Sequence, residues 1–307
     1  MTSRTVPVSA VESEAGGGLS SWIRLVRPKQ WVKNFFVLAP LLFSGKLLET
    51  DAVLAGATAF LAFCFAASSV YVLNDVVDRE ADRSHPTKRS RPIASGLIHP
   101  RQAILDGAVL AISALALTFS LGRAVTLIIL GYLILNALYS LRLKHVVILD
   151  VFSIATFFVL RLLGGASAIE VEPSIWLILC GGLLALYLGF AKRRHELTLL
   201  AGGSTEHRRV LGDYGTGFLD QMSAVLLAIT VVSYIMYTIS PAKVEEVGSY
   251  ALTYSLVFVL YGVFRYLYLV HQKSRGSPTE TLLTDRALLG TLVLWVLYCG
   301  WVIYRPF

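Results

Sequence analysis

Three oxygen-bearing side chains, Asn74, Asp78 and Asp82, recur at intervals of four residues after a long apolar run. If the segment is helical to about residue 84, side chains at this spacing lie along one face of the helix. Mg²⁺ binds one or two carboxylates and completes its shell with water and substrate phosphate oxygens, so we predict a catalytic Mg²⁺ site here. The alternative is a solvated acidic helix end that is balanced by Arg79 and Arg83.

Positive charges follow in the same polar loop, at Lys88, Arg89 and Arg91. A diphosphate beside a metal ion needs cations that neutralise its charge, so we predict that these three side chains bind substrate. The alternative is the ordinary excess of Lys and Arg on the cytoplasmic side of a membrane protein.

A second polar loop begins at Lys192, and we predict that Lys192, Arg193 and Glu196 belong to the catalytic site. Lys192 and Glu196 lie one helical turn apart, so a simple ion pair is the alternative. An enzyme that holds one diphosphate through two metal–carboxylate clusters would carry acids here. The three cations Lys192, Arg193 and Arg194 and the single acid Glu196 favour binding of a bare phosphate group instead.

Further substrate-binding candidates lie at the ends of other apolar runs, where contacts to anionic lipid headgroups are the alternative. They are Arg27, Lys29, Lys33, Asn34, Tyr139 and Lys144. Asp150, which opens the next apolar run, and Arg161, three turns further in, are also candidates for substrate binding. Arginine at membrane depth is costly unless it faces protein or a polar cavity, so we predict that Arg161 faces the bundle interior.

The elements that must position these residues are transmembrane helices. Of 307 residues, 55% are hydrophobic and 15% charged, against about 25% charged in soluble domains, and the mean hydropathy is +0.66. This composition excludes a disordered protein, a secreted disulfide scaffold and a cytosolic nucleic-acid binder, although the net charge is +7. The three cysteines and six histidines show no metal-ligand spacing.

Nine apolar stretches are predicted to cross the membrane. They are 31–48, 53–73, 102–121, 124–141, 147–168, 174–191, 219–240, 250–270 and 287–305. With the N-terminus in the cytoplasm, 21 Lys and Arg lie on that side, four lie outside and two lie within spans. This bias places the N-terminus and both polar loops in the cytoplasm and the C-terminus outside the cell (plasma) membrane.

Residues 1–20 are predicted to be a disordered tail without a signal peptide, and residues 21–307 to be one transmembrane domain. Residues 20–30 are predicted to form a short interfacial helix, with Trp22 and Trp31 as anchors. A homo-oligomer is compatible with the sequence, although no residue of the sequence identifies an interface.

The Asn74-x-x-x-Asp78-x-x-x-Asp82 element resembles the first aspartate motif of the UbiA prenyltransferase superfamily. The nine spans, the polar loops after the second and sixth spans, and the Tyr139–Lys144 segment fit the same superfamily over about residues 22–305. This resemblance implies an all-α bundle of nine transmembrane helices around a central cavity that opens to the cytoplasmic side. It also implies that the first motif binds Mg²⁺ and diphosphate.

The second polar loop departs from the usual members, which carry a second Asp-rich helix there. Together with residues 27–34 and 85–93, it resembles the decaprenyl-phosphate phosphoribosyltransferase branch. That resemblance implies transfer of 5-phosphoribose from phosphoribosyl diphosphate (PRPP) to a polyprenyl phosphate, a step of cell-wall arabinan synthesis in actinobacteria. Lys192, Arg193 and Lys29 or Lys33 would bind the donor's 5-phosphate or the lipid phosphate, and the two assignments stay open.

Three other functions are compatible with the membrane composition. An ordinary prenyltransferase would move a prenyl group from its diphosphate to an acceptor, but the second carboxylate cluster is missing. A transferase could also use another activated donor. A transporter would place its ionisable residues near the middle of the membrane, whereas the densest polar clusters here lie in loops.

Overall fold

The computed structural model describes residues 18–85, 88–201, 211–272, 281–282 and 284–305, and within them every regular element is a helix. The long helices are α3 (Thr50–Val77), α5 (Pro100–Thr118), α6 (Arg123–Leu141), α7 (Leu149–Ala168), α8 (Ile175–Ala201), α9 (Thr216–Thr238), α11 (Leu256–Gln272) and α13 (Arg286–Tyr304). The short elements are α1 (Leu19–Val26), η1 (Pro28–Leu38), α2 (Ala39–Phe43), α4 (Arg79–Ser84), η2 (Lys88–Ser90), η3 (Phe119–Leu121), η4 (Leu143–His145), α10 (Pro241–Val247) and η6 (Tyr250–Ser255). The predicted all-α class is confirmed.

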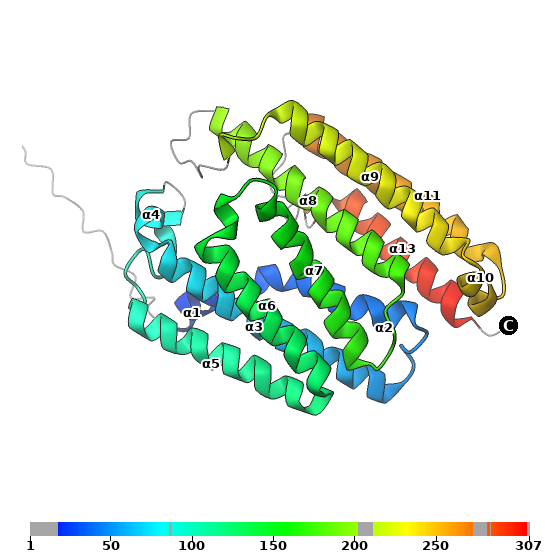
Figure 1. Ribbon diagram of the computed structural model, residues 1–307, viewed down its shortest axis with the longest axis horizontal. Helices are drawn as coiled ribbons and strands as arrows, with labels where there is room; N and C mark the ends of the chain where they lie inside the picture. The colour runs from blue at the N-terminus through cyan, green and yellow to red at the C-terminus, as the bar shows by residue number, and fades with distance from the viewer. Residues whose placement is uncertain (1–17, 86–87, 202–210, 273–280, 283, 306–307) are drawn as a thin grey trace, which may run out of the picture.

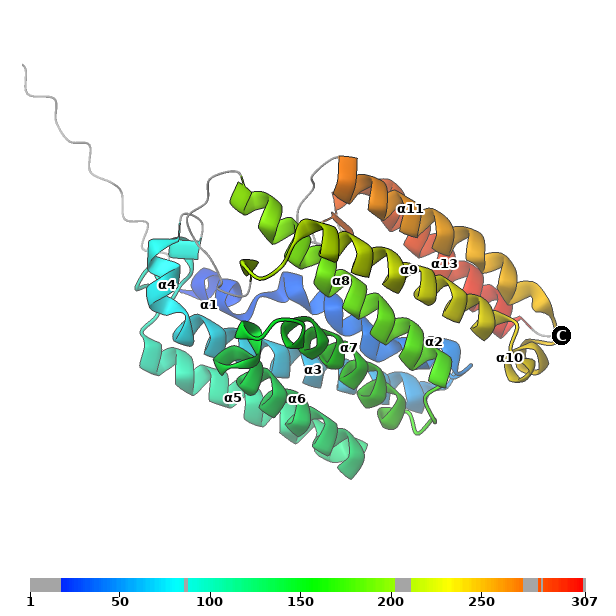
Figure 2. The same cartoon turned by 45° about the horizontal axis from the view of Figure 1, so that its top comes forward.

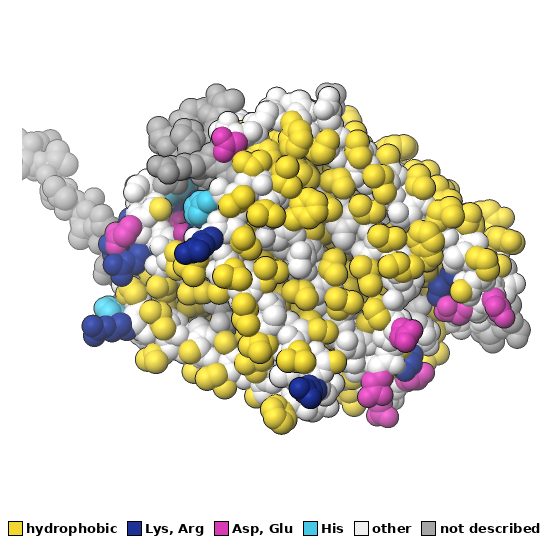
Figure 3. All heavy atoms as spheres, in the orientation of Figure 1, with side chains coloured by type: hydrophobic (Ala, Val, Ile, Leu, Met, Phe, Trp, Pro, Cys, Tyr) yellow, Lys and Arg dark blue, Asp and Glu magenta, His cyan; other side chains and the backbone are white. Residues whose placement is uncertain are grey.

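Eight segments of the described chain are long and apolar enough to cross a membrane. They are Thr50–Val77, Pro100–Leu121, Arg123–Leu141, Leu149–Ala168, Ile175–Thr198, Thr216–Thr238, Tyr250–Val270 and Arg286–Tyr304. Each overlaps one of the predicted spans from the second to the ninth. Hydrophobic side chains cover most of the face in Figure 3, while charged side chains gather toward its two ends. The protein is therefore a multi-pass membrane protein.

The first predicted span, 31–48, is not a regular transmembrane helix. The chain there forms the 3₁₀ helix η1, followed by the five-residue helix α2. Pro40 has no backbone N–H to donate, and the side chain of Asn34 is turned into the core. A ninth regular span is therefore not confirmed, because apolar composition does not distinguish a continuous α-helix from an irregular buried segment.

Close packing holds η1 in the interior of the bundle, between α3 and α7. A Cβ atom at Gly165 of α7 would lie 1.9 Å from the carbonyl oxygen of Val37, so only glycine allows this approach. On the other side, the indole of Trp31 donates a 3.0 Å hydrogen bond to Ser68 Oγ on α3. Trp31 therefore fastens η1 to α3, and its role as an interfacial anchor stays a prediction.

Helix α1 lies within the predicted interfacial segment, and its polar and apolar faces are distinct. Leu25 is fully buried, whereas Ile23 and Arg24 are exposed. The helix ends at Val26 because Arg27 takes a left-handed conformation, with φ of +54°. Of the predicted disordered tail, residues 1–17 lie outside the described residues, while residues 19 and 20 already belong to α1.

The helices are arranged so that both polar loops come to one end of the bundle. In Figures 1 and 2, α4 and the last turns of α8 lie at that end, and α2, α10 and the end of α13 lie at the other. Helix α7 packs between α6 and α8, and it thereby joins the two halves of the molecule. Residues more than 100 positions apart in sequence therefore share one end of the fold.

Candidate active site

The predicted helix continues to Ser84, but with a break at Asp78, where α3 ends and α4 begins. Two backbone bonds cross the break: the Asp78 N–H donates to Asn74 O and the Asp82 N–H to Asp78 O, each at 2.8 Å. The four-residue spacing therefore still repeats along nearly one direction. The half-buried Asn74 lies one turn before Asp78.

Basic side chains from three other segments bind the carboxylates of this junction. Arg91 Nη1 donates to Asp82 Oδ2 at 2.6 Å and to Asp75 Oδ1 at 3.1 Å. Lys144 Nζ forms an ion pair of 2.8 Å with Asp78 Oδ1. Arg27 also bonds Asp75. Because one nitrogen bonds both Asp75 and Asp82, their carboxylates lie close together.

The sequence reasoning missed Asp75. Its side chain is buried, and its Oδ2 atom has no hydrogen-bond partner, which is costly for a polar atom. The signal was present, because Asp75 directly follows Asn74 at the end of an apolar run. Its spacings of three residues to Asp78 and seven to Asp82 excluded it from the strict i, i+4 pattern, although they place it close to both acids.

The donor atoms at this junction fit Mg²⁺. Within the described ranges no three His, Cys, Asp or Glu side chains converge into a site that could hold a metal by themselves. Asn74, Asp78 and Asp82 supply two carboxylates and one amide oxygen, which is enough for an ion that takes its other ligands from water and phosphate. The unpartnered Asp75 Oδ2 adds buried negative charge next to them.

The predicted cations of the first polar loop separate into two groups. Arg91 folds back onto the carboxylates, as described above. Lys88 and Arg89 lie on the short helix η2; Lys88 is half-buried and Arg89 is exposed. Within the described chain neither has an ion pair. They therefore remain available to an anionic substrate.

At the end of α8, Arg193 has a different environment from Lys192. The Arg193 side chain is fully buried: its Nε donates to Asp150 Oδ2 at 2.5 Å, and its two Nη groups bond Glu196 and the Tyr139 hydroxyl. Its donors are used inside the protein, so these contacts indicate a positioning role. Lys192 Nζ lies 3.9 Å from Glu196 Oε1, and its side chain is 43% exposed.

Tyr214, which precedes α9, completes this network and was not predicted. Its O–H donates to Asp150 Oδ1 at 2.8 Å, and its oxygen accepts the backbone N–H of Ile148 at 2.6 Å. Burial raises the pKa of the Tyr214 phenol, which therefore stays protonated as a donor. No local pattern reveals this contact, because 64 residues separate Tyr214 from Asp150.

Arg161 faces the bundle interior, as predicted. Its Nε donates to Asn34 Oδ1 at 2.7 Å, and its Nη2 donates to the Tyr132 hydroxyl at 2.8 Å. A third donor meets the carbonyl oxygen of Phe157 at 2.9 Å. Arg161 and Asn34, both predicted to bind substrate, therefore bond each other and hold η1 against α7.

Other cations of η1 are not paired in this way. Lys33 is half-buried, and Lys29 is exposed; neither has an ion pair in the part of the chain that the structure describes. Lys33 is within electrostatic range of Lys192, Arg27 and Arg161. Lys33 of η1 and Lys192 of the second polar loop therefore lie near each other.

The last turn of α6 and the connection to α7 contact both polar loops. Lys144 bonds Asp78 of the first loop, and Tyr139 bonds Arg193 of the second. At this end of the bundle the acids of α3 and α4 lie on one side and Lys192 on the other. Asp78 and Lys192 are each more than one-third exposed, whereas Arg193 is inaccessible. Chemically, the arrangement offers oxygen ligands for a metal ion and a partly exposed amine for a phosphate group.

Comparisons with known sequences and solved structures agree with one another on the family of this chain. Residues 35–292 match the sequence model of the UbiA prenyltransferase family. The decaprenyl-phosphate phosphoribosyltransferase of Mycolicibacterium smegmatis is 31% identical, over 93% of both chains. That of Corynebacterium glutamicum is also 31% identical, over 92% of this chain and 86% of its own length. The solved UbiA homolog from Archaeoglobus fulgidus bound to DMAPP and Mg²⁺ shares the fold, with a TM-score of 0.71, 20% identity and coverage of 93% and 100%.

Proposed function

This chain belongs to the UbiA prenyltransferase family and is a membrane transferase, and from that premise we propose that it transfers 5-phosphoribose from PRPP to a polyprenyl phosphate, with release of pyrophosphate. The reaction would depend on Mg²⁺. Full-length similarity to decaprenyl-phosphate phosphoribosyltransferases supports the choice of substrates.

The observation that carries the proposal is the chemistry at the end of α8. The last turns of α8 carry the cations Lys192, Arg193 and Arg194 and one carboxylate, Glu196; Arg193 is buried, and Arg194 pairs with Asp220 of α9. A second metal–carboxylate cluster cannot be built from one acid. A cationic site of this kind suits a phosphate group that carries no metal of its own.

The acidic junction would hold the diphosphate of the donor. Asn74, Asp78 and Asp82 would bind Mg²⁺, which when bound neutralises charge on the leaving diphosphate. Lys88 and Arg89 extend from the adjacent loop and would contact the same group. Lys144 and Arg91 fix the orientation of Asp78 and Asp82 through their ion pairs.

In the proposed reaction, an oxygen of the lipid phosphate forms a bond to C1 of the ribose. The bond from C1 to the diphosphate oxygen breaks, and pyrophosphate leaves with the electron pair. The attacking phosphate is already ionised, so no general base is required. Lys192 would hold one of the two phosphate monoesters, and catalysis would come from positioning and charge stabilisation.

A radiolabel transfer assay tests the proposal. Purified protein in detergent is incubated with PRPP labelled in the ribose, a polyprenyl phosphate and Mg²⁺, and label in the organic phase is measured. We expect transfer that EDTA abolishes and that Asp82→Asn lacks. If a well-folded protein instead releases pyrophosphate from a prenyl diphosphate and ignores PRPP, the chain is an ordinary prenyltransferase.

A further inference from the structure

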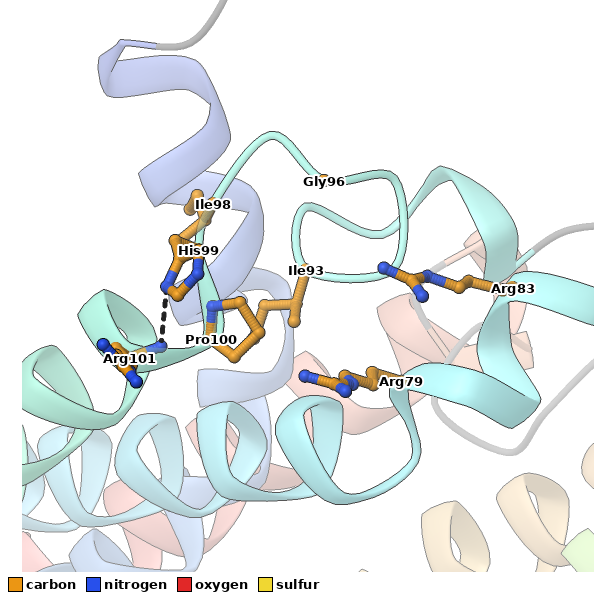
Figure 4. A pocket seen from close by; sticks show the side chains of 8 residues that line it. All are labelled: Arg79, Arg83, Ile93, Gly96, Ile98, His99, Pro100 and Arg101. Atoms are coloured by element: carbon orange, nitrogen blue, oxygen red, sulfur yellow. Dashed lines mark hydrogen bonds between the residues drawn. The ribbon is translucent and has the colours of Figure 1, made fainter.

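A pocket of about 350 Å³ lies between α4 and the start of α5, outside the site described above (Figure 4). None of its lining residues contributes to that site. They are Arg79, Arg83, Ile93, Gly96, Ile98, His99, Pro100 and Arg101. Figure 4 shows the guanidinium groups of Arg79 and Arg83 reaching from α4 toward the loop that carries Gly96, with His99 and Arg101 on the opposite side.

Helix geometry separates this pocket from the acidic junction. Arg79 and Arg83 are four residues apart, so they share one face of α4. Asp78 and Asp82 occupy a face turned by about 100°. The same short helix therefore presents acids to the proposed active site and arginines to the pocket.

The pocket has an excess of positive charge. Arg79 and Arg83 share one carboxylate, that of Glu80, at 2.9 and 3.1 Å. Glu80 therefore supplies one negative charge to two cations. Arg101 is exposed, and its guanidinium has no partner among the described residues. Two positive charges thus remain uncompensated.

Two side chains of the rim are held in place by the protein itself. Arg83 Nε donates to the carbonyl oxygen of Ala94 at 3.2 Å, which ties the loop to α4. His99 Nδ1 accepts the backbone N–H of Arg101 at 3.2 Å, so the ring proton lies on Nε2, which can donate to a ligand. The pocket is therefore shaped before any ligand binds.

An apolar surface begins directly beside the pocket. Leu105, Val109 and Ile112 follow Arg101 at helical spacing on α5, and they are 67, 62 and 66% exposed. Because α5 is one of the eight candidate membrane spans, this face lies against lipid chains. A cationic pocket above an apolar helix face matches the shape of a lipid with an anionic headgroup.

We propose that this pocket binds the phosphate headgroup of an anionic membrane lipid, whose acyl chain lies on the Leu105, Val109 and Ile112 face of α5. Arg79 and Arg101 contact the phosphate from opposite sides, and His99 Nε2–H donates to it. This inference does not depend on the substrates of the transferase.

Native mass spectrometry of the purified full-length protein tests the lipid site. The first binding event is titrated with dioleoyl phosphatidylglycerol and with dioleoyl phosphatidylcholine, which has the same chains and no net charge. We expect tighter binding of the anionic lipid, and loss of this preference in Arg79→Gln combined with Arg101→Gln. Each lost contact is to a charged phosphate, so the double variant should bind about tenfold more weakly or worse.

Arg142→Gln is the matched control, because Arg142 is also exposed at a helix end but lies outside the pocket. It should bind the anionic lipid as the unmodified protein does. The side chain of Arg79 is 42% exposed and that of Arg101 is exposed, and the only ion pair of the two is the surface pair of Arg79 with Glu80 among the described residues, so the double variant should melt normally. Arg101→Gln alone serves if the double variant does not fold.

Glycerol 3-phosphate, which has a phosphate but no acyl chain, separates a lipid from a soluble ligand. It should not compete with the anionic lipid at equal concentration. Competition at equal concentration would overturn the lipid assignment in favour of a soluble phosphate. Unchanged lipid preference in the double variant, or equal loss in Arg142→Gln, would overturn the site itself.

Discussion

At the residue scale, the acids at the α3–α4 junction differ in accessibility. Asp78 is one-third exposed and pairs with the buried Lys144, whereas Asp82 is buried against Arg91. Asp78→Asn and Asp82→Asn should each lower Mg²⁺-dependent turnover by about 100-fold or more, because an amide removes the charge that the metal requires.

Turnover and thermal melting in detergent, measured on the same preparations, check this prediction. Asp220→Asn is the matched control, since Asp220 pairs with Arg194 between α8 and α9, away from the junction. If either variant keeps full activity, the substituted acid does not belong to the catalytic site.

Lys192 and Arg193 are adjacent in sequence but should respond differently to substitution. Lys192→Ala removes a partly exposed amine, so it should weaken binding of a phosphorylated substrate and leave the melting temperature nearly unchanged. Arg193→Ala leaves Asp150 buried without its cation, so it should destabilise the fold by about 3 kcal/mol. Substrate titrations and melting curves of both variants check the difference, and similar behaviour of the two would contradict these roles.

At the scale of the element, η1 depends on the absence of a side chain at Gly165. Gly165→Ala would bring a Cβ into the backbone of Val37, which cannot move without displacing η1. We expect a loss of about 3 kcal/mol or failure to fold, because backbone atoms must shift.

Gly131→Ala on α6 is its control, because no atom lies within 4 Å of the added Cβ. Melting of the two variants in detergent gives the comparison. Equal stability would show that η1 is not held against α7 as described.

At the scale of the whole molecule, we predict that the site faces the cytoplasm and that the C-terminal end of α13 faces outside. Arg142 directly follows α6, two residues before Lys144, which bonds Asp78 at the polar end of α3; Glu49 precedes the opposite end of α3, and both positions are exposed. Each is replaced by cysteine in turn. An impermeant thiol reagent on intact cells should label only Glu49→Cys. Cys64 and Cys299 are buried, and the partly exposed Cys180 is replaced by Ala in both variants, so background labelling should be low. Labelling of Arg142→Cys in intact cells would reverse the orientation.

The sequence by itself determined the eight regular spans and the spacing of the acids along α3 and α4. Both are local properties, because membrane-crossing length and helical periodicity are set within about 20 residues. The interior position of Arg161 was also predictable, since a charge at membrane depth must face protein. The irregular form of η1 was not, because it depends on contacts to α3 and α7.

The tertiary structure alone decided which polar residues meet. Asn34 and Arg161 are 127 positions apart, Lys144 and Asp78 are 66 apart, and neither spacing leaves a local signal. The fold likewise separated Lys192 from Arg193, one accessible and one buried, although composition treats them alike. Burial and pairing depend on how helices pack in space, and it is this packing that assigns each charge a ligand-binding or a positioning role.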